Sequence, residues 1–428
     1  MKRRSPRTRI GPAVRRAAVR GLKAALGAMR RAMHGATYRP VFQDGSPKAP
    51  SGGFEPPITG RPRRILLGAP LVPVLLAACG GAPPALPPVI EAYGRAVPRD
   101  SLARTLYVFN YTDYLAPELM SRFEREYGVK VVVDFYDHTD AMIAKLLAGG
   151  VGQYDVVIAA DYAVSVLRAR DLLLPLDHAR LPLLANLDST FRDPPFDPGN
   201  RYSVCYQWGT SGLGIRTDRV PAGRPLDSWR LVFDSGSAVG PFTMLDEPRE
   251  VIGAALKYLG FSANTTDSAE LARAEALLLA QHRRVLAYAS ATGGRDLLAA
   301  GDAVVAHAYS GDVVTARAEV PAIRYVLPRE GTLLWTDNVV IPVGARSRYT
   351  AEVFVNFLLD AGNGAALSTY TRFATPNRAA FPLVDSGLTA DPAIYPPPEV
   401  RARLEILRDL GADARLYDAV WTRVMAGR

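Results

Sequence analysis

The stretch LYVFNYTDYLAPELMSRFEREYGVKVVVDFYDHTDAMIAKLLAGGVGQYDVVIAADYAVSVLRARD (106–171) decides the fold, because short apolar runs alternate in it with helical patterns. Buried strands are predicted at 106–109, 129–135 and 154–159. Helices are predicted to follow them at 117–127, 140–148 and 162–171. Strands that alternate with helices at this spacing predict an α/β fold with a parallel, doubly wound sheet.

Polar and aromatic residues follow each of these three strands. The strand ends lead into Tyr111-Thr112-Asp113-Tyr114, then Asp137-His138, then Asp161-Tyr162. Ligands of such sheets bind at the carboxyl ends of the strands. The sequence therefore predicts an acidic, aromatic ligand site along this edge of the sheet.

Later segments predict a second α/β unit, and 428 residues are enough for two domains. One strand is expected to end at Gly214-Ile215, and others are expected at 303–309 and 338–342. Helices are expected at 247–259, at 268–279, from Gly311 onward, and at 350–359, 398–407 and 413–425. The pattern contains no internal repeat.

The formal net charge of +9 is concentrated at one end of the chain. Residues 1–64 contain 16 Lys and Arg against Asp44 and Glu55, a net charge of +14, which leaves −5 for the remainder. The remainder is therefore mildly acidic, which argues against nucleic-acid binding and permits a cationic ligand.

An export signal is predicted in RPRRILLGAPLVPVLLAACG (61–80). Its apolar run at 65–78 follows three arginines and is shorter than the ~20 residues of a membrane span. Small residues directly before Cys79 resemble a lipobox, which implies that Cys79 is lipidated and anchors the protein to a membrane. The alternative is a hydrophobic leader with a chance cysteine. Cys205 is left without a partner, so no disulfide is expected.

The segments on either side of this signal are expected to lack packed structure. Residues 1–60 are interpreted as a disordered or misannotated leader, with the true start nearer Arg61, although 13–33 could form a basic amphipathic helix. Residues 80–103 are rich in Pro, Gly and Ala and are predicted to be a tether.

Eight segments from Leu106 onward closely resemble the bacterial extracellular polyamine-binding proteins, which are putrescine and spermidine receptors of ATP-driven (ABC) importers. They are LYVFNYTDYLAPELMSRFEREYGVKV (106–131), YDVVIAADYAV (154–164), PFDPGNRYSVCYQWGTSGLGI (195–215), LDEPREVIGAALKYLGFSANTTD (245–267), AYSGDVV (308–314), EGTLLWTDNVVIP (330–342), FATPNRAAFPLV (373–384) and DPAIYPPPEVRARL (391–404). No single segment is unique, but their ordered set is specific, and the last two look more like the putrescine branch.

The resemblance implies a type II periplasmic-binding-protein fold with the ligand between two lobes, each a central sheet flanked by helices. Lobe 1 would comprise 104–207 and 336–385. Lobe 2 would comprise 208–335, together with the C-terminal helices of 386–428. The chain would cross between lobes near 205–208 and 333–338. A monomer that delivers a polyamine to a permease is expected, without cofactor, metal or nucleic acid.

A linear diamine is a dication with an apolar middle, so its receptor needs carboxylates at both ends and aromatic rings between them. The positions that match the family are Tyr111, Thr112, Asp113, Tyr114, Asp161, Tyr162, Glu247, Glu250, Tyr309, Asp312, Trp335, Asp337 and Phe373.

The resemblance also implies roles for these residues. Asp337 and Glu250 would bind one ammonium group, and Asp113 and Asp312 the other. Tyr309 and Trp335 would hold the methylene chain, with Tyr111 closing the far wall. The pair Asp113 and Asp312 favours putrescine, because the spermidine receptors have a neutral residue at the second position.

Several positions depart from the family pattern and leave the choice of amine open. Tyr111 and Tyr309 replace tryptophans, Ala160 replaces a serine, and Phe373 lacks a hydroxyl group. Asp161 adds an acid at a usually neutral position.

Other interpretations are weighed on the same residues. Glu247 and Glu250 could act only at a helix N-terminus, which Pro248 would begin. Paired tyrosines keep a ferric-ion site open, whereas an anion site would need arginines that the lobe 1 strand ends lack. An enzyme on this fold would need Cys205 as its nucleophile. The histidines show no metal-ligand spacing; His138 could contact ligand, and His307 is predicted to lie in the core.

Overall fold

The computed structural model describes residues 88–427. The predicted leader (1–60) and the predicted signal with Cys79 (61–79) lie outside these residues. Among the described residues, no helix is long and apolar enough to cross a membrane.

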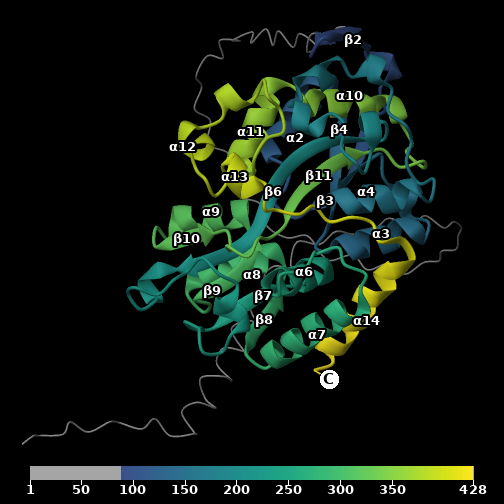
Figure 1. Ribbon diagram of the computed structural model, residues 1–428. Coiled ribbons are helices and arrows are strands. Elements are labelled where there is room, and N and C mark those ends of the chain that lie inside the picture. The colour runs from purple at the N-terminus through teal and green to yellow at the C-terminus, as the bar shows by residue number, and fades with distance from the viewer. Residues whose placement is uncertain (1–87, 428) are drawn as a thin grey trace, which may run out of the picture. The chain divides into compact units, whose positions relative to one another are not determined.

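A nine-stranded sheet runs through the described part of the chain in the order β4-β3-β5-β11-β6-β9-β7-β8, with β10 beside β6 (Figure 1). In lobe 1 the strands are β3 (Thr105–Tyr111), β4 (Lys130–Tyr136) and β5 (Val156–Ala160), which are parallel to one another. In lobe 2 they are β7 (Phe242–Leu245), β8 (Val285–Ala289) and β9 (Val305–Tyr309), also parallel, and β10 (Ile323–Val326). The fold is thus the predicted two-lobed α/β fold.

Two antiparallel strands join the lobes. β6 (Ser203–Arg216) is buried at each of its 14 residues, and it pairs with β11 in lobe 1 and with β9 and β10 in lobe 2. β11 (Leu334–Val340) lies between β5 and β6. The predicted crossing segments, 205–208 and 333–338, lie in or beside these two strands.

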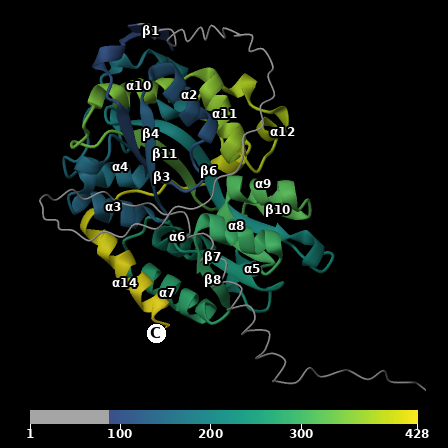
Figure 2. The same ribbon diagram turned by 180° about the vertical axis from the view of Figure 1, so that it is seen from behind.

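Helices cover both lobes, and lobe 1 lies above lobe 2 in Figure 1. The lobe 1 helices are α2 (Pro117–Tyr127), α3 (Thr139–Leu147), α4 (Asp161–Arg168), α10 (Arg348–Leu358) and α11 (Ala361–Thr371). The lobe 2 helices are α5 (Arg230–Phe233), α6 (Pro248–Tyr258), α7 (Ser268–His282), α8 (Ala291–Ala300), α9 (Ser310–Glu319) and α14 (Ala414–Met425). Seen from behind, α14 runs along α7 (Figure 2). Two short helices, α12 (Ser386–Thr389) and α13 (Pro398–Arg401), precede α14 in the chain.

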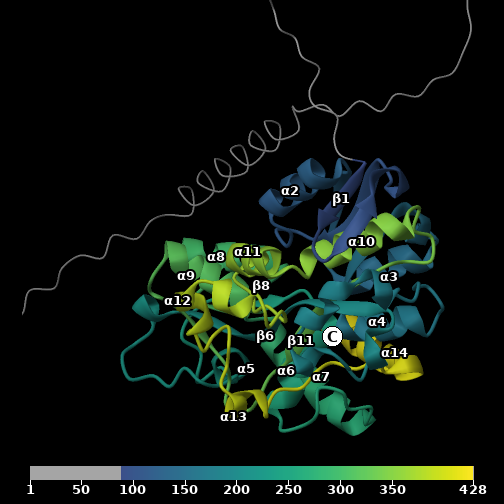
Figure 3. The ribbon, with the colours of Figure 1, turned by 90° about the horizontal axis from the view of Figure 1, so that it is seen from above.

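The tether prediction is wrong for its second half, which forms a hairpin of β1 (Val89–Ala92) and β2 (Arg95–Pro98). Tyr93 and Gly94 both have positive φ, as a tight two-residue hairpin turn requires. The Tyr93 ring meets the edge of Phe357 at 5.3 Å, and β1 lies beside α2 and α10 (Figure 3). The contacts of Tyr93 with Tyr127 and Phe357 therefore pack the hairpin against lobe 1, despite the Pro- and Ala-rich composition of residues 80–103.

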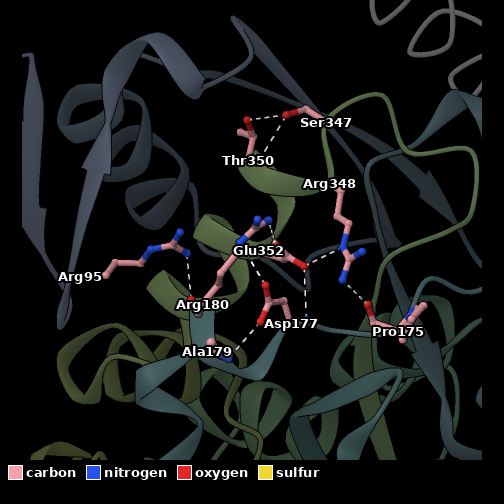
Figure 4. A network of polar contacts seen from close by, with 9 residues as sticks. All are labelled: Arg95, Pro175, Asp177, Ala179, Arg180, Ser347, Arg348, Thr350 and Glu352. Carbon is pink, nitrogen blue, oxygen red and sulfur yellow. Dashed lines mark hydrogen bonds and ion pairs between the residues drawn. The ribbon is translucent and has the colours of Figure 1, made fainter.

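A polar network also holds this hairpin to lobe 1 (Figure 4). Glu352 of α10 is fully buried and accepts hydrogen bonds from Arg348 Nε at 2.8 Å and from Arg180 Nη1 at 2.9 Å. The Arg180 carbonyl accepts a hydrogen bond from Arg95 Nη1 of β2 at 2.8 Å.

The helix predicted at 398–407 is wrong beyond Arg401. Residues after α13 are extended, because the backbone of Glu405 exchanges hydrogen bonds with Thr332 and Leu334 beside β11. The Glu405 carboxylate pairs with Lys257 Nζ of α6 at 2.6 Å. The segment therefore crosses the molecule and reaches the cavity described next.

Candidate ligand-binding site

All thirteen predicted ligand-binding residues line one cavity of about 310 Å³ between the lobes. Lobe 1 contributes the end of β3 with the loop after it and the start of α4; lobe 2 contributes the end of β9 and the starts of α6 and α9. Trp335 and Asp337 come from β11. The structure thus gathers these residues around one hollow, and their contact with a ligand stays a prediction.

Asp337 and Glu250, which we call the inner carboxylates, both line the cavity. Asp337 comes from β11, and Glu250 comes from α6 of lobe 2. Asp337 lies opposite Ala160 of β5 and Gln207 of β6, and its Oδ2 accepts a hydrogen bond from the Tyr114 hydroxyl at 2.9 Å. Glu250 is 6% exposed, and its Oε2 has no hydrogen-bond partner in the described part of the chain. A buried acceptor without a donor is costly, so this oxygen is available to a ligand N–H group.

Burial raises the pKa of both inner carboxylates to about 7, from 3.8 for Asp337 and from 4.5 for Glu250. In each case loss of water around the ionised form is the main cause. A cation placed between them would favour ionisation of both groups.

Asp161 has a different position from the inner carboxylates. Its two oxygens accept hydrogen bonds from the backbone N–H groups of Tyr162 (2.8 Å) and Thr336 (3.2 Å), so the side chain ties the start of α4 to β11. Burial still raises its pKa to about 8, with Asp337 and Glu250 adding like-charge repulsion.

Asp113 and Asp312, which we call the outer carboxylates, lie near a basic residue that the sequence analysis missed. Arg295 of α8 places Nη2 at 3.8 Å from Asp113 Oδ2 and Nη1 at 4.0 Å from Asp312 Oδ1. Burial raises the pKa of Asp312 to about 7, although Arg295 opposes the shift. Asp113 has a φ of +57°, a left-handed conformation that turns the chain sharply after β3.

Aromatic rings line the same cavity as the inner and outer carboxylates. Trp335 meets Tyr309 and Phe373 edge-on, with ring centroids 5.4 and 5.1 Å apart, and Phe373 meets Tyr114 at 5.5 Å. This arrangement needs two glycines: a Cβ at Gly209 would lie 2.5 Å from the Trp335 ring, and one at Gly311 would lie 2.6 Å from Phe373.

Burial raises the pKa of Tyr111, Tyr114, Tyr162 and Tyr309 well above the ordinary value of 10.0. These residues are therefore neutral phenols near neutral pH.

Glu247 and His138 make contacts between the lobes. Glu247 Oε1 accepts a hydrogen bond from the Thr139 N–H at 3.2 Å. His138 does not line the cavity; it places Nε2 at 3.8 Å from Asp246 and Nδ1 at 3.9 Å from Glu247. The two lobes thus already touch at this edge of the cavity.

Cys205 and His307 lie away from the cavity. The Cys205 thiol is buried, points to the Gln207 carbonyl at 3.7 Å, and has its pKa raised well above 9.0 by burial. A reactive thiol needs the opposite shift. His307 packs edge-on against Trp229 at 5.1 Å, and burial lowers its pKa to about 3, which confirms the predicted core position.

Sequence reasoning missed several other lining residues. Arg249 follows the predicted Glu247 and Pro248 but was not singled out, and Tyr370 belongs to a helix that was not predicted. The largest group comes from the start of α8: Ser290, Ala291, Thr292 and Arg295. Leu407 reaches the cavity only because the segment after α13 is extended.

Two lobes that share a pair of strands and enclose an acidic, aromatic cavity define the class of two-lobed solute receptors. Comparison with known proteins gives the family: the chain belongs to the bacterial extracellular solute-binding proteins, whose family model matches residues 118–396.

Named relatives fall within the polyamine receptors, as the resemblance implied. The chain is 38% identical over 333 residues to the putrescine/cadaverine-binding protein of Pseudomonas aeruginosa, an alignment that covers 75% of this chain and 94% of that protein. It is 32% identical over 324 residues to the spermidine/putrescine-binding periplasmic protein of Escherichia coli, covering 76% and 92%.

Solved structures agree with this assignment. A putative spermidine/putrescine ABC transporter protein from Listeria monocytogenes superposes with a TM-score of 0.72 at 34% identity, covering 76% of this chain and 100% of that one. The Tp0655 (TpPotD) lipoprotein of Treponema pallidum superposes with a TM-score of 0.66 at 29% identity, covering 75% and 99%.

Proposed function

We propose that this protein is the receptor of a polyamine importer and that it captures a short diamine, such as putrescine, by closing its lobes. The observation that carries the proposal is the charge of the cavity. Of the described residues that line it, seven are Asp or Glu and two are Arg. Such a lining attracts an organic cation and disfavours an anion.

The geometry suggests how each part of a diamine is bound. One ammonium group donates hydrogen bonds to the inner carboxylates, including the unpartnered oxygen of Glu250. The methylene chain lies along Trp335, Tyr309 and Phe373, whose ring faces also attract the ammonium groups. The second ammonium group lies at the outer carboxylates.

Closure follows from the position of these groups on both lobes. Asp113 belongs to lobe 1, and Glu250 and Asp312 belong to lobe 2, so a bound dication interacts favourably with both only when the lobes are together. A ligand with this differential affinity shifts the population towards the closed state. The closed receptor then delivers the amine to the importer's permease; it catalyses no covalent reaction.

The names of the relatives support the ligand class, since they are described as binding putrescine, cadaverine or spermidine. A lipid anchor at Cys79 and a place on the outer side of the cytoplasmic membrane, in the periplasm or its equivalent, are part of the proposal. The sequence before Cys79 and the relative described as a lipoprotein support them.

Isothermal titration calorimetry of the purified protein tests the ligand. Putrescine and cadaverine should bind saturably with 1:1 stoichiometry, whereas sulfate and ferric citrate should give no binding heat. Binding of sulfate or iron in place of every amine would refute the proposed function. Mass spectrometry of the membrane-bound protein, which should show an acylated Cys79 at its N-terminus, tests the anchor separately.

A further inference from the structure

Arg295 is a positively charged residue in the wall of a cavity that we propose binds a cation, so its presence there needs a separate explanation. It comes from the first half of α8 in lobe 2, and its guanidinium lies within 4.0 Å of a carboxylate from each lobe. The side chain is 20% exposed, so it is largely covered by the cavity wall.

The contacts of Arg295 leave the outer carboxylates available to a ligand. At 3.8 and 4.0 Å, its distances to Asp113 and Asp312 are longer than direct hydrogen bonds. Its Nε donates instead to Asp296 Oδ1 at 3.0 Å, and Asp296 is 70% exposed. The guanidinium is thus held beside the outer carboxylates without using their acceptor positions.

Because Arg295 lies beside the outer carboxylates, it limits how much positive charge a ligand can place near them. Asp296 does not line the cavity and is 70% exposed, so water screens its charge. The two carboxylates and the guanidinium that line the cavity here leave a single net negative charge when all three groups are ionised. One ammonium group is matched by this charge. A second ammonium group at the same end would lie close to a fixed positive charge, in a partly buried site where like charges repel strongly.

We propose that Arg295 sets the selectivity of the receptor for diamines over triamines, by admitting one ammonium group to the outer carboxylates and repelling a further one. The inference rests on the proposed function and adds to it a specificity-determining residue. Asp113 and Asp312 alone would present two negative charges to a longer polyamine, and Arg295 offsets one of them.

The test compares putrescine and spermidine by calorimetry on the unchanged protein and on Arg295→Gln, Arg295→Lys and Arg230→Gln. Arg230 is a matched control, because it is a half-exposed lobe 2 arginine paired with Asp234 away from the cavity. The unchanged protein should bind putrescine at least tenfold more tightly than spermidine. Arg295→Gln should reduce this ratio at least fivefold, mainly by tightening spermidine, whereas Arg295→Lys and Arg230→Gln should retain it.

Three outcomes would overturn the inference. Equal affinity of the unchanged protein for the two amines would do so without any variant. The same ratio in Arg295→Gln as in the unchanged protein would do so while leaving the proposed function intact. Failure of the unchanged protein to bind either amine would remove the proposed function and this inference together. Circular dichroism checks that each variant is folded.

Discussion

At the scale of single residues, the inner carboxylates show how burial prepares a carboxyl group to bind a cation. Asp337 is 7% exposed, and among the described residues a single tyrosine hydroxyl donates a hydrogen bond to its side chain. Its ionised form is therefore poorly solvated, and an ammonium group would supply the missing interactions.

Replacing Asp337 by Asn should weaken putrescine binding at least tenfold, about 1.4 kcal/mol, because the amide cannot balance the ammonium charge. Trp335→Ala should have an effect of similar size by removing the central ring of the aromatic wall. Calorimetry gives the affinities. Asp302→Asn, at an exposed lobe 2 position, serves as the control. Unchanged affinity in both cavity variants would refute the site.

The raised pKa values of Asp337 and Glu250, both about 7, predict proton release on binding. A dication lowers both pKa values, so protons should leave the protein near pH 7, and affinity should fall as pH decreases below about 7. Calorimetry in two buffers of different ionisation enthalpy measures the release. Identical heats in both buffers would contradict the prediction.

The raised pKa values of Asp337 and Glu250 also make the stability of the ligand-free protein depend on pH. Between about pH 4 and about pH 7 the folded state binds more protons at these groups than the unfolded state does. Their contribution therefore makes the free energy of unfolding decrease as pH rises through this window.

Residues of the site were predictable where a family motif names them, and not otherwise. Asp113, Trp335 and Asp337 belong to contiguous motifs that keep their order in the sequence. Arg295 belongs to no such motif, and its role depends on its distances to Asp312 on the next helix and to Asp113, which is far away in the chain. Those distances arise only from the packing of α8 across the cavity.

At the scale of elements, helix α2 was predicted from the sequence and helix α8 was not. The first was predicted at its observed bounds, because Pro117 begins it, Gly128 ends it, and Leu119, Phe123 and Tyr127 share one buried face. The second contains Gly293 and Gly294, which lower helix propensity. It is held by Ser290, whose hydroxyl accepts a hydrogen bond from the Gly293 N–H, and by the buried Leu298.

Gly209→Ala should weaken amine binding several-fold and lower the free energy of unfolding by about 1–3 kcal/mol, since a Cβ at this point of buried β6 would push the Trp335 ring out of place. Gly152→Ala is the matched control, because a Cβ there meets nothing within 4 Å. Affinity and thermal unfolding are measured on both. Equal affinities would show that the ring does not need this close approach.

Glu352→Gln should destabilise the protein by about 2 kcal/mol, because a buried carboxylate that accepts charged hydrogen bonds from two arginines is lost. Glu118→Gln should change stability by less than ~0.5 kcal/mol, since that glutamate is 72% exposed in its pair with Arg122. Denaturant unfolding gives both values. Putrescine affinity should be unchanged, and a loss of affinity without a loss of stability would contradict this structural role.

At the scale of the molecule, the contacts of Thr139 and His138 with lobe 2 bring the two lobes together at one edge of the cavity. Small-angle X-ray scattering should give a smaller radius of gyration with putrescine than without it. The Asp337→Asn variant at the same amine concentration should change less. Equal radii for the unchanged protein with and without putrescine would argue against ligand-driven closure.

The order of strands in lobe 1 has a consequence for biosynthesis. β11 sits between β5 and β6, so the sheet of this lobe cannot be completed until the ribosome has delivered residue 340. A nascent chain of this topology stays without a finished core through most of its translation. That delay would suit the proposed export, in which the polypeptide passes through a narrow translocation channel before it folds.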